Sequence, residues 1–554
     1  MGNGESGVWG CAGAEVRGKG LEEIIYFFNN GLQNSSSGLY PFPLIPLLPC
    51  SQLNLQPSPP PPPLSVPPHA RLKPYDAPMM PDPFIRADEV LHEKWDSRAL
   101  QLELEHGNGG LLGLVSRVGS AGPFRTLSPW ELEDPQSHRT LNASGYSALP
   151  FGDNYPPLLE FVRSYLEKNR QIGLPQQSVT PWRAALETNL IRLLAQFAPS
   201  HADSRVFFSN SGTEAVEGAI KFAKAARPRA KHLIHFSKAY HGKTLLSLSL
   251  TPNPSLQRGF EPWLIPTVTL PFGDLEQVKS TLKKLGPDNV VCVLLEPIQG
   301  EAGVVIPPPG FLRGVGELCQ KYGIPSIADE IQSGLGRTGH WFESLAQGWE
   351  PDIICLAKPL GGGLTAVGAT LMRDAIFKKL LGKTNDVKRH SNTFGGNSLA
   401  MAIGLKSLEI LREQNLPERS ERLGKLGLER LLKMKERHPE LLAEVRGAGM
   451  LMAMVFRPVI GTKWLPIGGQ IVGELTGLLA QRAFYQGGVQ LNFTLNVAKA
   501  LRVTPAMNMP EELFEELLLK LEHTIERTRT AGRLLTGTSR AELLSLAEYV
   551  LKNG

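Results

Sequence analysis

The residues of this sequence that could do chemistry begin with Lys358, in the stretch DIICLAKPLGGG (residues 352–363). The apolar run before it is short, as expected for a buried strand of a parallel sheet. A lysine is almost never fully buried without a partner. Lys358 therefore either reaches water where the strand leaves the core, or is a reactive amine. A desolvated lysine loses its charge more easily and can form a Schiff base with an aldehyde.

A carboxylate precedes this lysine at the end of another apolar run. Asp329 and Glu330 close the stretch IPSIADE, and Asp329 lies 29 residues before Lys358 (358 − 329). One strand–helix–strand passage takes roughly 30 residues, so we expect the two residues on nearby strands at the same edge of the sheet. A buried carboxylate needs a cationic or hydrogen-bonding partner, and a protonated pyridine nitrogen would serve.

Two further strand ends carry polar residues. In RVFFSNSGTEA a predicted strand turns through Ser211, Gly212 and Thr213 into a helix. The free N–H groups of that helix and the hydroxyls predict an anion site suited to phosphate, with a simple N-cap as the alternative. Tyr240 follows the next strand, in SKAYHGKT, where it could stack on a flat ring or lie in a surface loop.

Together these four groups describe one ligand. A phosphate site, a stacking aromatic ring, a carboxylate for a ring nitrogen and an amine for an aldehyde are what pyridoxal 5'-phosphate requires. The combination favours this cofactor over the separate structural readings of each residue.

The elements that must position these residues are strands alternating with helices. Predicted strands lie at 205–209, 231–237, 290–298, 324–330 and 352–358, and predicted helices at 185–198, 213–226 and 310–322. Such alternation predicts an α/β fold with a mostly parallel sheet. After about residue 400 the pattern changes: helices at 396–411, 419–438 and 510–528 accompany a strand at 449–456. This change predicts a second, smaller α+β domain.

The chain divides into five predicted segments. Residues 1–80 form a Pro-rich leader that cannot build a packed core, and translation from Met79 or Met80 is an alternative. Residues 81–180 are expected to contribute to the small domain and the substrate entrance, and 181–400 to form the large cofactor-binding domain. Residues 401–530 are expected to form the C-terminal small domain, and 531–554 a helical extension.

Composition excludes several classes of function. The net charge is +5 over 554 residues with mixed signs, which argues against a nucleic-acid surface. The five cysteines are scattered without a CxxC pair, so neither a disulfide framework nor a metal site is indicated, and a reducing cytoplasm is expected. No apolar run reaches the ~18 residues of a spanning helix, and no secretory signal is seen, so no membrane partner is expected.

Six motifs carry a resemblance to a known family. The stretches NSGTEA, YHGKT, LLEPIQGEAGV, IADEIQSGLGRTG, LAKPLGGG and NTFGGNSLA look like the fold-type I, class III aminotransferases over roughly residues 140–520. The resemblance implies that Lys358 carries the cofactor and shuttles the proton, and that Asp329 pairs with the pyridine nitrogen. It further implies a phosphate site at Gly212 and Thr213, stacking by Tyr240, Gln332 near the phenolic oxygen, and Thr393 on the phosphate of the neighbouring subunit in an obligate homodimer.

Within the family, the ornithine, acetylornithine and 4-aminobutyrate branch is the most similar. Glu301 matches a gate glutamate, and Arg502 an arginine that binds the α-carboxylate of glutamate or 2-oxoglutarate; a structural ion pair is the alternative. Tyr146 resembles an aromatic residue of the substrate pocket. Lys243 stands where these enzymes commonly have a substrate-binding arginine, and lysine cannot make the planar two-point contact.

These residues imply an amino-group transfer. The expected reaction moves an amino group from an ornithine-like, acetylornithine-like or lysine-like donor to 2-oxoglutarate. The alternative is an amino-acid racemase, epimerase or aminomutase on the same scaffold, and a third hypothesis is a catalytically silent binding protein. The Glu301 and Arg502 pair favours the transferase, because a racemase needs no 2-oxoglutarate site.

Overall fold

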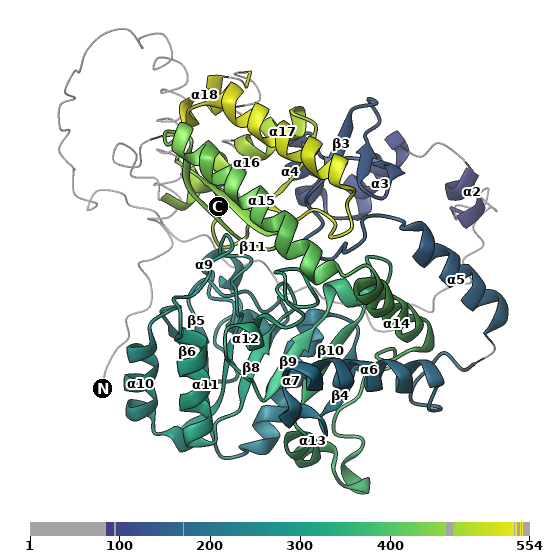
Figure 1. The fold of residues 1–554 in the computed structure, drawn as a ribbon, viewed down its shortest axis with the longest axis vertical. Helices are drawn as coiled ribbons and strands as arrows, with labels where there is room; N and C mark the ends of the chain where they lie inside the picture. Colours follow the sequence, from purple (N-terminus) through teal and green to yellow (C-terminus); the bar gives the residue numbers. More distant parts are fainter. Residues whose placement is uncertain are drawn as a thin grey trace, which may run out of the picture.

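The computed structural model describes residues 85–92, 96–169, 171–460, 469–536, 538, 539, 543 and 546 (Figure 1). The predicted leader 1–80 lies outside the described residues. Most of the predicted extension 531–554 also lies outside them, and its described part begins with α18 (Ala531–Thr536). The segment boundaries between these parts stay predictions.

A seven-stranded sheet forms the centre of the lower half of the molecule in Figure 1. Its strand order is β4-β10-β9-β8-β7-β5-β6, and the pairs from β9 to β6 are parallel. Only β10 runs against both of its neighbours. The predicted α/β fold with a mostly parallel sheet is thus confirmed. The strands are β4 (Arg205–Ser209), β5 (His232–Phe236), β6 (Thr267–Leu270), β7 (Val290–Leu295), β8 (Ser326–Asp329), β9 (Ile353–Leu356) and β10 (Gly368–Met372).

Both faces of this sheet are covered, as its apolar central strands β7 and β9 require. All six residues of β7 are buried. Val293 and Leu295 belong to one hydrophobic cluster with α6 and α11, whereas Leu294 belongs to a second cluster with α7. The helices of this half are α6 (Pro181–Phe197), α7 (Gly212–Ala226), α8 (Leu245–Ser249), α9 (Pro254–Gln257), α10 (Leu275–Leu285), α11 (Phe311–Tyr322), α12 (Glu343–Ala346), α13 (Asp374–Leu381) and α14 (Ser398–Glu413).

A smaller antiparallel sheet lies in the upper half, in the order β11-β12-β15-β14. Long helices pack on it, so the predicted α+β character of the C-terminal region is confirmed. The strands are β11 (Leu442–Ala448), β12 (Leu451–Phe456), β14 (Asn492–Phe493) and β15 (Ala500–Val503). The helices are α15 (Leu416–Arg437), α16 (Gly469–Gln486) and α17 (Glu511–Thr528).

The N-terminal segment joins this upper half through a third sheet. Strand β3 pairs in parallel with β13, so residues far apart in the sequence lie side by side. This sheet contains β1 (Arg125–Ser128), β2 (Glu131–Glu133), β3 (Arg139–Asn142) and β13 (Val489–Gln490). The preceding helices and α5 complete the segment: α2 (Ala87–His92), α3 (Asp96–His106), α4 (Gly109–Arg117) and α5 (Pro156–Lys168).

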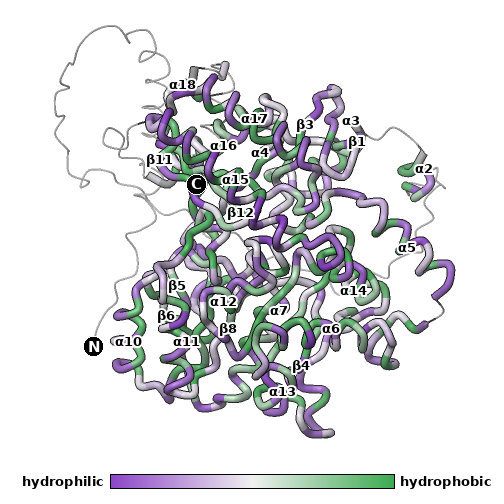
Figure 2. The backbone as a smooth tube through the Cα atoms, viewed as in Figure 1, coloured by the Kyte–Doolittle hydropathy of each residue, from purple (hydrophilic) through white to green (hydrophobic). Residues whose placement is uncertain are grey.

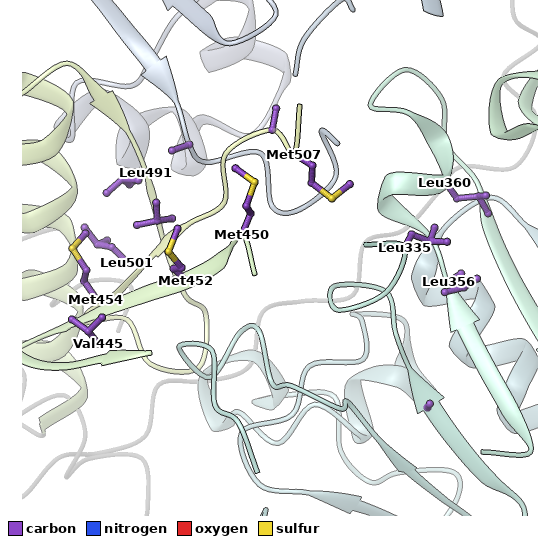
Figure 3. Close-up of a cluster of buried hydrophobic side chains, with 14 of the residues drawn as sticks. Leu335, Leu356, Leu360, Val445, Met450, Met452, Met454, Leu491, Leu501 and Met507 are labelled. Carbon is purple, nitrogen blue, oxygen red and sulfur yellow. The ribbon is translucent and has the colours of Figure 1, made fainter. Parts of the chain in front are cut away.

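One hydrophobic cluster runs through both halves of the molecule. It includes Met452 and Met454 of the small sheet as well as Leu356 of the large sheet and Leu360 in the turn after β9, and Figure 3 shows both groups. The helices around the sheets carry both green and purple stretches in Figure 2, as amphipathic helices do. None of the described helices is both long and apolar enough to cross a lipid bilayer.

Candidate active site

The carboxyl ends of the large sheet's strands assemble the candidate site. Strands β5, β7, β8 and β9 end at or just before Tyr240, Glu296, Asp329 and Lys358. With the start of α7 these residues line a cavity of about 540 Å³. Ligands of open α/β sheets bind outside this edge, which is where the sequence analysis expected the chemistry.

Lys358 lines the cavity directly after β9. Its φ of +40° is a left-handed conformation that is uncommon outside glycine. Burial lowers the pKa of the Lys358 amine to about 8; the carboxylates of Glu301 and Asp329 oppose burial, and Arg502 adds to it. The neutral, nucleophilic fraction of this amine near neutral pH is therefore much larger than that of an ordinary lysine.

Asp329 lies on the neighbouring strand, as its spacing from Lys358 predicted. It is the last residue of β8 and pairs in register with Cys355 of β9. Its Oδ1 accepts a hydrogen bond from Ile331 N at 3.2 Å, and its Oδ2 lies 2.7 Å from His241 Nδ1. His241 is itself buried, so Asp329 is held from behind by an imidazole.

The start of α7 forms another wall of the cavity. Ser211 is the N-cap, because its Oγ accepts a hydrogen bond from Glu214 N at 3.1 Å. The cap does not use the first N–H groups of the helix, so the N-cap and anion-site readings are compatible. A Cβ on Gly212 would lie 2.7 Å from Ile331 Cδ1, and one on Gly242 would overlap Thr213. Both glycines are needed where these loops converge.

Glu301 and Arg502 form a buried ion pair across the two halves of the molecule. Arg502 Nη1 donates to Glu301 Oε1 and also to Gln332 Oε1 at 3.1 Å. Gln332 Nε2 donates back to Glu301 Oε1 at 2.9 Å, and Leu495 N donates to Glu301 Oε2 at 3.0 Å. Burial raises the pKa of Glu301, but Arg502 and Lys358 outweigh burial and hold it below its ordinary value.

Arg502 keeps hydrogen-bonding capacity in this arrangement. It is fully buried, yet its Nε and Nη2 have no partner among the residues that the structure describes. The ring of Tyr146 covers the guanidinium, with its centroid 5.3 Å from the central carbon. Tyr146 itself is 52% exposed. Buried donors are rarely left unpaired, so these two nitrogens point to a further acceptor.

Glu296 is a site residue that the sequence analysis did not single out. It lines the cavity, and its Oε1 accepts a hydrogen bond from Tyr240 N at 3.0 Å. Burial, followed by the charge of Asp329, holds the pKa of Glu296 well above its ordinary value. Burial also raises the pKa of Tyr240, and the carboxylate of Glu301 adds to this.

Five predicted site residues are not among those that line this cavity: Tyr146, Lys243, Glu301, Thr393 and Arg502. Of these five, Lys243 and Thr393 take no part in the contacts around Arg502 that are described above. Lys243 is exposed on the loop between β5 and α8 and does not line the cavity. Thr393 is exposed in the segment before α14 and is also absent from the cavity wall. The substrate contact proposed for Lys243 stays a prediction. The exposure of Thr393 is compatible with its predicted contact across a dimer.

Comparison with known families decides the class. The model of the family described as "Aminotransferase class-III" matches residues 131–525, well over half of the chain. The chain belongs to the class-III aminotransferases. It is therefore a pyridoxal-phosphate-dependent transaminase, with an amino donor and an oxo-acid acceptor as substrates.

Solved structures similar to this aminotransferase share its fold. Acetylornithine aminotransferase from Elizabethkingia anophelis is 26% identical, covering 78% of this chain and 99% of its own, with a TM-score of 0.63. Ornithine aminotransferase from Toxoplasma gondii is 24% identical over 73% of this chain and 91% of its own, also with a TM-score of 0.63, and has pyridoxal phosphate at its active site. An aminotransferase from Bacillus anthracis is 23% identical over 80% of this chain and 100% of its own, with a TM-score of 0.67.

Sequence reasoning on this aminotransferase missed His241 and Glu296. Both stand inside motifs that the analysis quoted, YHGKT and LLEPIQGEAGV. Position within the motif was the available signal, because His241 directly follows Tyr240 and Glu296 directly follows a strand. Their partners, Asp329 and the backbone of Tyr240, are distant in sequence and become visible only in the folded chain.

Proposed function

We propose that this aminotransferase holds pyridoxal phosphate in the 540 Å³ cavity, with Lys358 as the point of covalent attachment. The residues present fit that group. An amine of lowered pKa faces a carboxylate on the next strand, and a helix begins at the cavity wall. Gly212 and Gly242, which also line the cavity, let the start of the helix approach Ile331 and let the Tyr240 segment approach Thr213.

Each remaining residue has a proposed role toward the cofactor. Asp329, oriented by His241, would pair with the pyridine nitrogen, and Tyr240 would stack on the ring. The start of α7, with Ser211, Gly212 and Thr213, would hold the phosphate, and Gln332 would lie near the phenolic oxygen. The bound cofactor supplies an electron sink for the substrate carbanion. The neutral amine of Lys358 would take the proton from the α- or terminal carbon that bears the donor's amino group, and would return it to a different carbon, which makes Lys358 the proton shuttle.

We infer that the two substrates are a terminal-amine donor and 2-oxoglutarate. The observation that carries this inference is the state of Arg502, whose Nη1 is bound to Glu301 while Nε and Nη2 lack partners among the described residues. A carboxylate prefers the two-point contact that such a guanidinium edge offers. With Glu301 paired, the charge of Arg502 is neutralised, which suits a donor that presents no carboxylate there. Candidate donors are ornithine-like, acetylornithine-like or lysine-like.

We further propose that the active unit is a homodimer in which Thr393 serves the partner's phosphate site. Thr393 is exposed and does not line the cavity of its own chain. Its neighbour Asn392 is nevertheless anchored to the large sheet, because Asn392 Nδ2 donates to Phe208 O at 3.2 Å. An exposed hydroxyl on an anchored segment is suited to a contact with a second copy.

A panel of amines and amino acids, each given alone to the cofactor-loaded enzyme, tests the function. The enzyme should convert its cofactor from the aldehyde to the amine form with a terminal-amine donor, and 2-oxoglutarate should restore the aldehyde form. Absorbance of the cofactor follows both steps. Glutamate that leaves the cofactor in the aldehyde form while its α-centre is scrambled would instead support a racemase.

A further inference from the structure

Two loops of the candidate site are joined by hydrogen bonds that its chemistry does not require. The Tyr240 loop (residues 237–244) connects β5 to α8, and the Glu301 loop (residues 296–305) follows β7. The first carries the proposed stacking residue and the second the proposed gate carboxylate. The positions of these two side chains must agree for one ligand to meet both.

Glu296 forms the first link, at the base of the Glu301 loop. Its Oε1 accepts from Tyr240 N at 3.0 Å, and its Oε2 accepts from Gly300 N at 3.2 Å. One buried carboxyl group therefore fixes the backbone next to both functional side chains. Gln299 adds a bond in the same direction, because its Nε2 donates to Ser237 O at 2.9 Å.

Asn496 forms a second, independent link from the small domain. Its Nδ2 donates to Lys238 O at 2.9 Å and to Ala239 O at 3.0 Å, and its backbone N donates to Glu301 O at 3.0 Å. Its Oδ1 accepts from Asn253 Nδ2 at 2.9 Å. Asn496 lies between β14 and β15, and β15 carries Arg502. The same residue thus ties the hairpin of the arginine to both loops.

The backbone of both loops needs such support. Lys238 has a φ of +60° and Val304 a φ of +56°, and neither is glycine. Residues with a Cβ adopt this conformation at a cost in free energy, and they persist in it only where surrounding contacts fix them. Lys238 is one of the residues whose carbonyl Asn496 holds.

We propose that Glu296 and Asn496 are positioning residues that fix the Tyr240 loop and the Glu301 loop to each other, so that the gate opens by rotation of the Glu301 side chain on a stationary backbone. This inference rests on the function proposed above for Glu301 and Tyr240. It deepens that function, because exchange of the two substrates at Arg502 then requires no loop movement. The ring-stacking position stays the same in both half-reactions.

Two nearly isosteric variants test the proposal. Glu296→Gln places an amide NH₂ against one of two N–H donors, and Asn496→Asp removes the donor to the two carbonyls. Matched controls are Glu330→Gln, whose carboxyl binds Ser344 N and Ser333 Oγ, and Asn289→Asp, whose amide donates to Leu285 O away from the cavity. The first readout is hydrogen exchange of peptides containing Tyr240 and Gly300 in protein freed of cofactor.

Each test variant should accelerate exchange in both peptides by roughly tenfold, the factor expected for one buried hydrogen bond, and the controls should not. The second readout is the ratio of single-turnover rates with glutamate and with a terminal-amine donor. The test variants should shift this ratio toward glutamate, in the same direction as Glu301→Ala, because a displaced Glu301 neutralises Arg502 less well. The double variant should shift it by less than the product of the two single effects.

Unchanged exchange in either peptide overturns the proposal. Equal losses in both half-reactions also overturn it, because a purely structural role would lower both alike. If Asn496→Asp is recovered only as insoluble protein, Glu296→Gln alone gives the same comparison with the same meaning. If no amino acid reacts with the wild-type enzyme, the proposed function fails, and the exchange readout still decides whether these residues hold the loops together.

Discussion

Arg502 and Glu301 lie in the interior, where removing one partner of a charge pair leaves the other uncompensated. The pair also differs from an ordinary structural bridge, because Gln332 bonds to both partners and lines the cavity. A change at either charge is therefore transmitted to a residue in contact with the ligand space. The pair is either a gate or a structural ion pair, and these two interpretations predict different half-reactions to be slowed when one of the two residues is replaced.

The gate reading predicts opposite effects for the two charges. Arg502→Ala should cost on the order of 2–5 kcal/mol in the half-reaction with glutamate or 2-oxoglutarate, and less with a terminal-amine donor. Glu301→Ala should leave Arg502 free, so that glutamate competes better as a donor. Single-turnover absorbance of the cofactor measures each half-reaction separately. Equal damage to both half-reactions in both variants would identify a structural pair.

The environment of Lys358 predicts a pH dependence. Burial lowers the pKa of this amine to about 8 from the 10.5 of an ordinary lysine, so its neutral form should become dominant above about pH 8. In cofactor-free enzyme, the labelling of Lys358 by an amine-selective reagent should rise with pH, with a midpoint near pH 8. Mass spectrometry of the peptide that contains Lys358 measures the extent of labelling. Glu301→Gln removes a carboxylate that raises this pKa, so the midpoint should move lower. A midpoint near 10.5 would contradict the assignment.

Residue types and spacing predicted part of the site. Lys358 and Asp329 were predictable because an ionisable residue at the end of an apolar strand is costly to bury unless a partner or ligand compensates its charge. The strands that end near these two residues are neighbours, as the register of Asp329 with Cys355 confirms. Asn496 carried no such signal, since it lies in a short turn between Leu495 and Val497, and its partners are more than 190 residues away.

At the level of elements, the site depends on how closely the Tyr240 loop approaches the start of α7. Gly242 has a φ of +124°, and a Cβ there would overlap the side chain of Thr213. The loop and the helix are therefore in contact at the proposed phosphate site. No other residue type fits at this position without moving one of them.

Gly242→Ala should weaken cofactor binding by roughly 10- to 100-fold, since strain of about 1–3 kcal/mol is added at the phosphate site. Equilibrium dialysis of pyridoxal phosphate against the cofactor-free protein measures the change. Gly259→Ala is the matched control: Gly259 has a φ of +87° but no atom within 4 Å of an added Cβ. Equal losses in the two variants would show that the contact with Thr213 has no role.

Helices and strands with a clear pattern of apolar residues were predicted well. Strands that depend on pairing with distant strands were not. Helices such as α6 and α17 and strands such as β7 follow directly from the pattern of apolar residues, and all are confirmed. Strand β10 is fully buried and apolar, but its antiparallel direction depends on pairing with β4 and β9. The short strands β1 to β3 have mixed polarity and exist through their mutual pairing, which local sequence does not reveal.

At the scale of the whole molecule, the proposed dimer predicts a result that a monomer cannot give. A Lys358→Ala subunit and a Thr393→Asp subunit should each be inactive alone, the second because Asp repels the phosphate. In a mixed dimer, one site would combine the intact Lys358 of one chain with the intact Thr393 of the other. Refolding the two variants together should restore about one quarter of wild-type activity, since half of the dimers are mixed and one of their two sites is intact.

The control compares the refolded mixture with each variant refolded alone, and chromatography that separates mixed dimers from the parent dimers shows whether mixed dimers have formed. No recovery, with mixed dimers present, would show that Thr393 serves its own chain. Wild-type activity of Thr393→Asp alone would show that it serves neither site. The two halves of each subunit should stay together in this experiment, because one hydrophobic cluster spans both sheets.

The pairing of β3 with β13 can form only late in synthesis, because β13 is translated long after β3. The hydroxyl of Tyr485 donates to Asp134, 351 residues earlier, beside the same sheet. At about 5–20 residues per second, a ribosome needs roughly 20 to 70 s to cover that distance. During this interval β1 to β3 are already synthesised, and the edge of β3 that β13 will occupy is open. An open strand edge is a template for other chains, so we expect the first third of this polypeptide to depend on chaperones until its final third emerges.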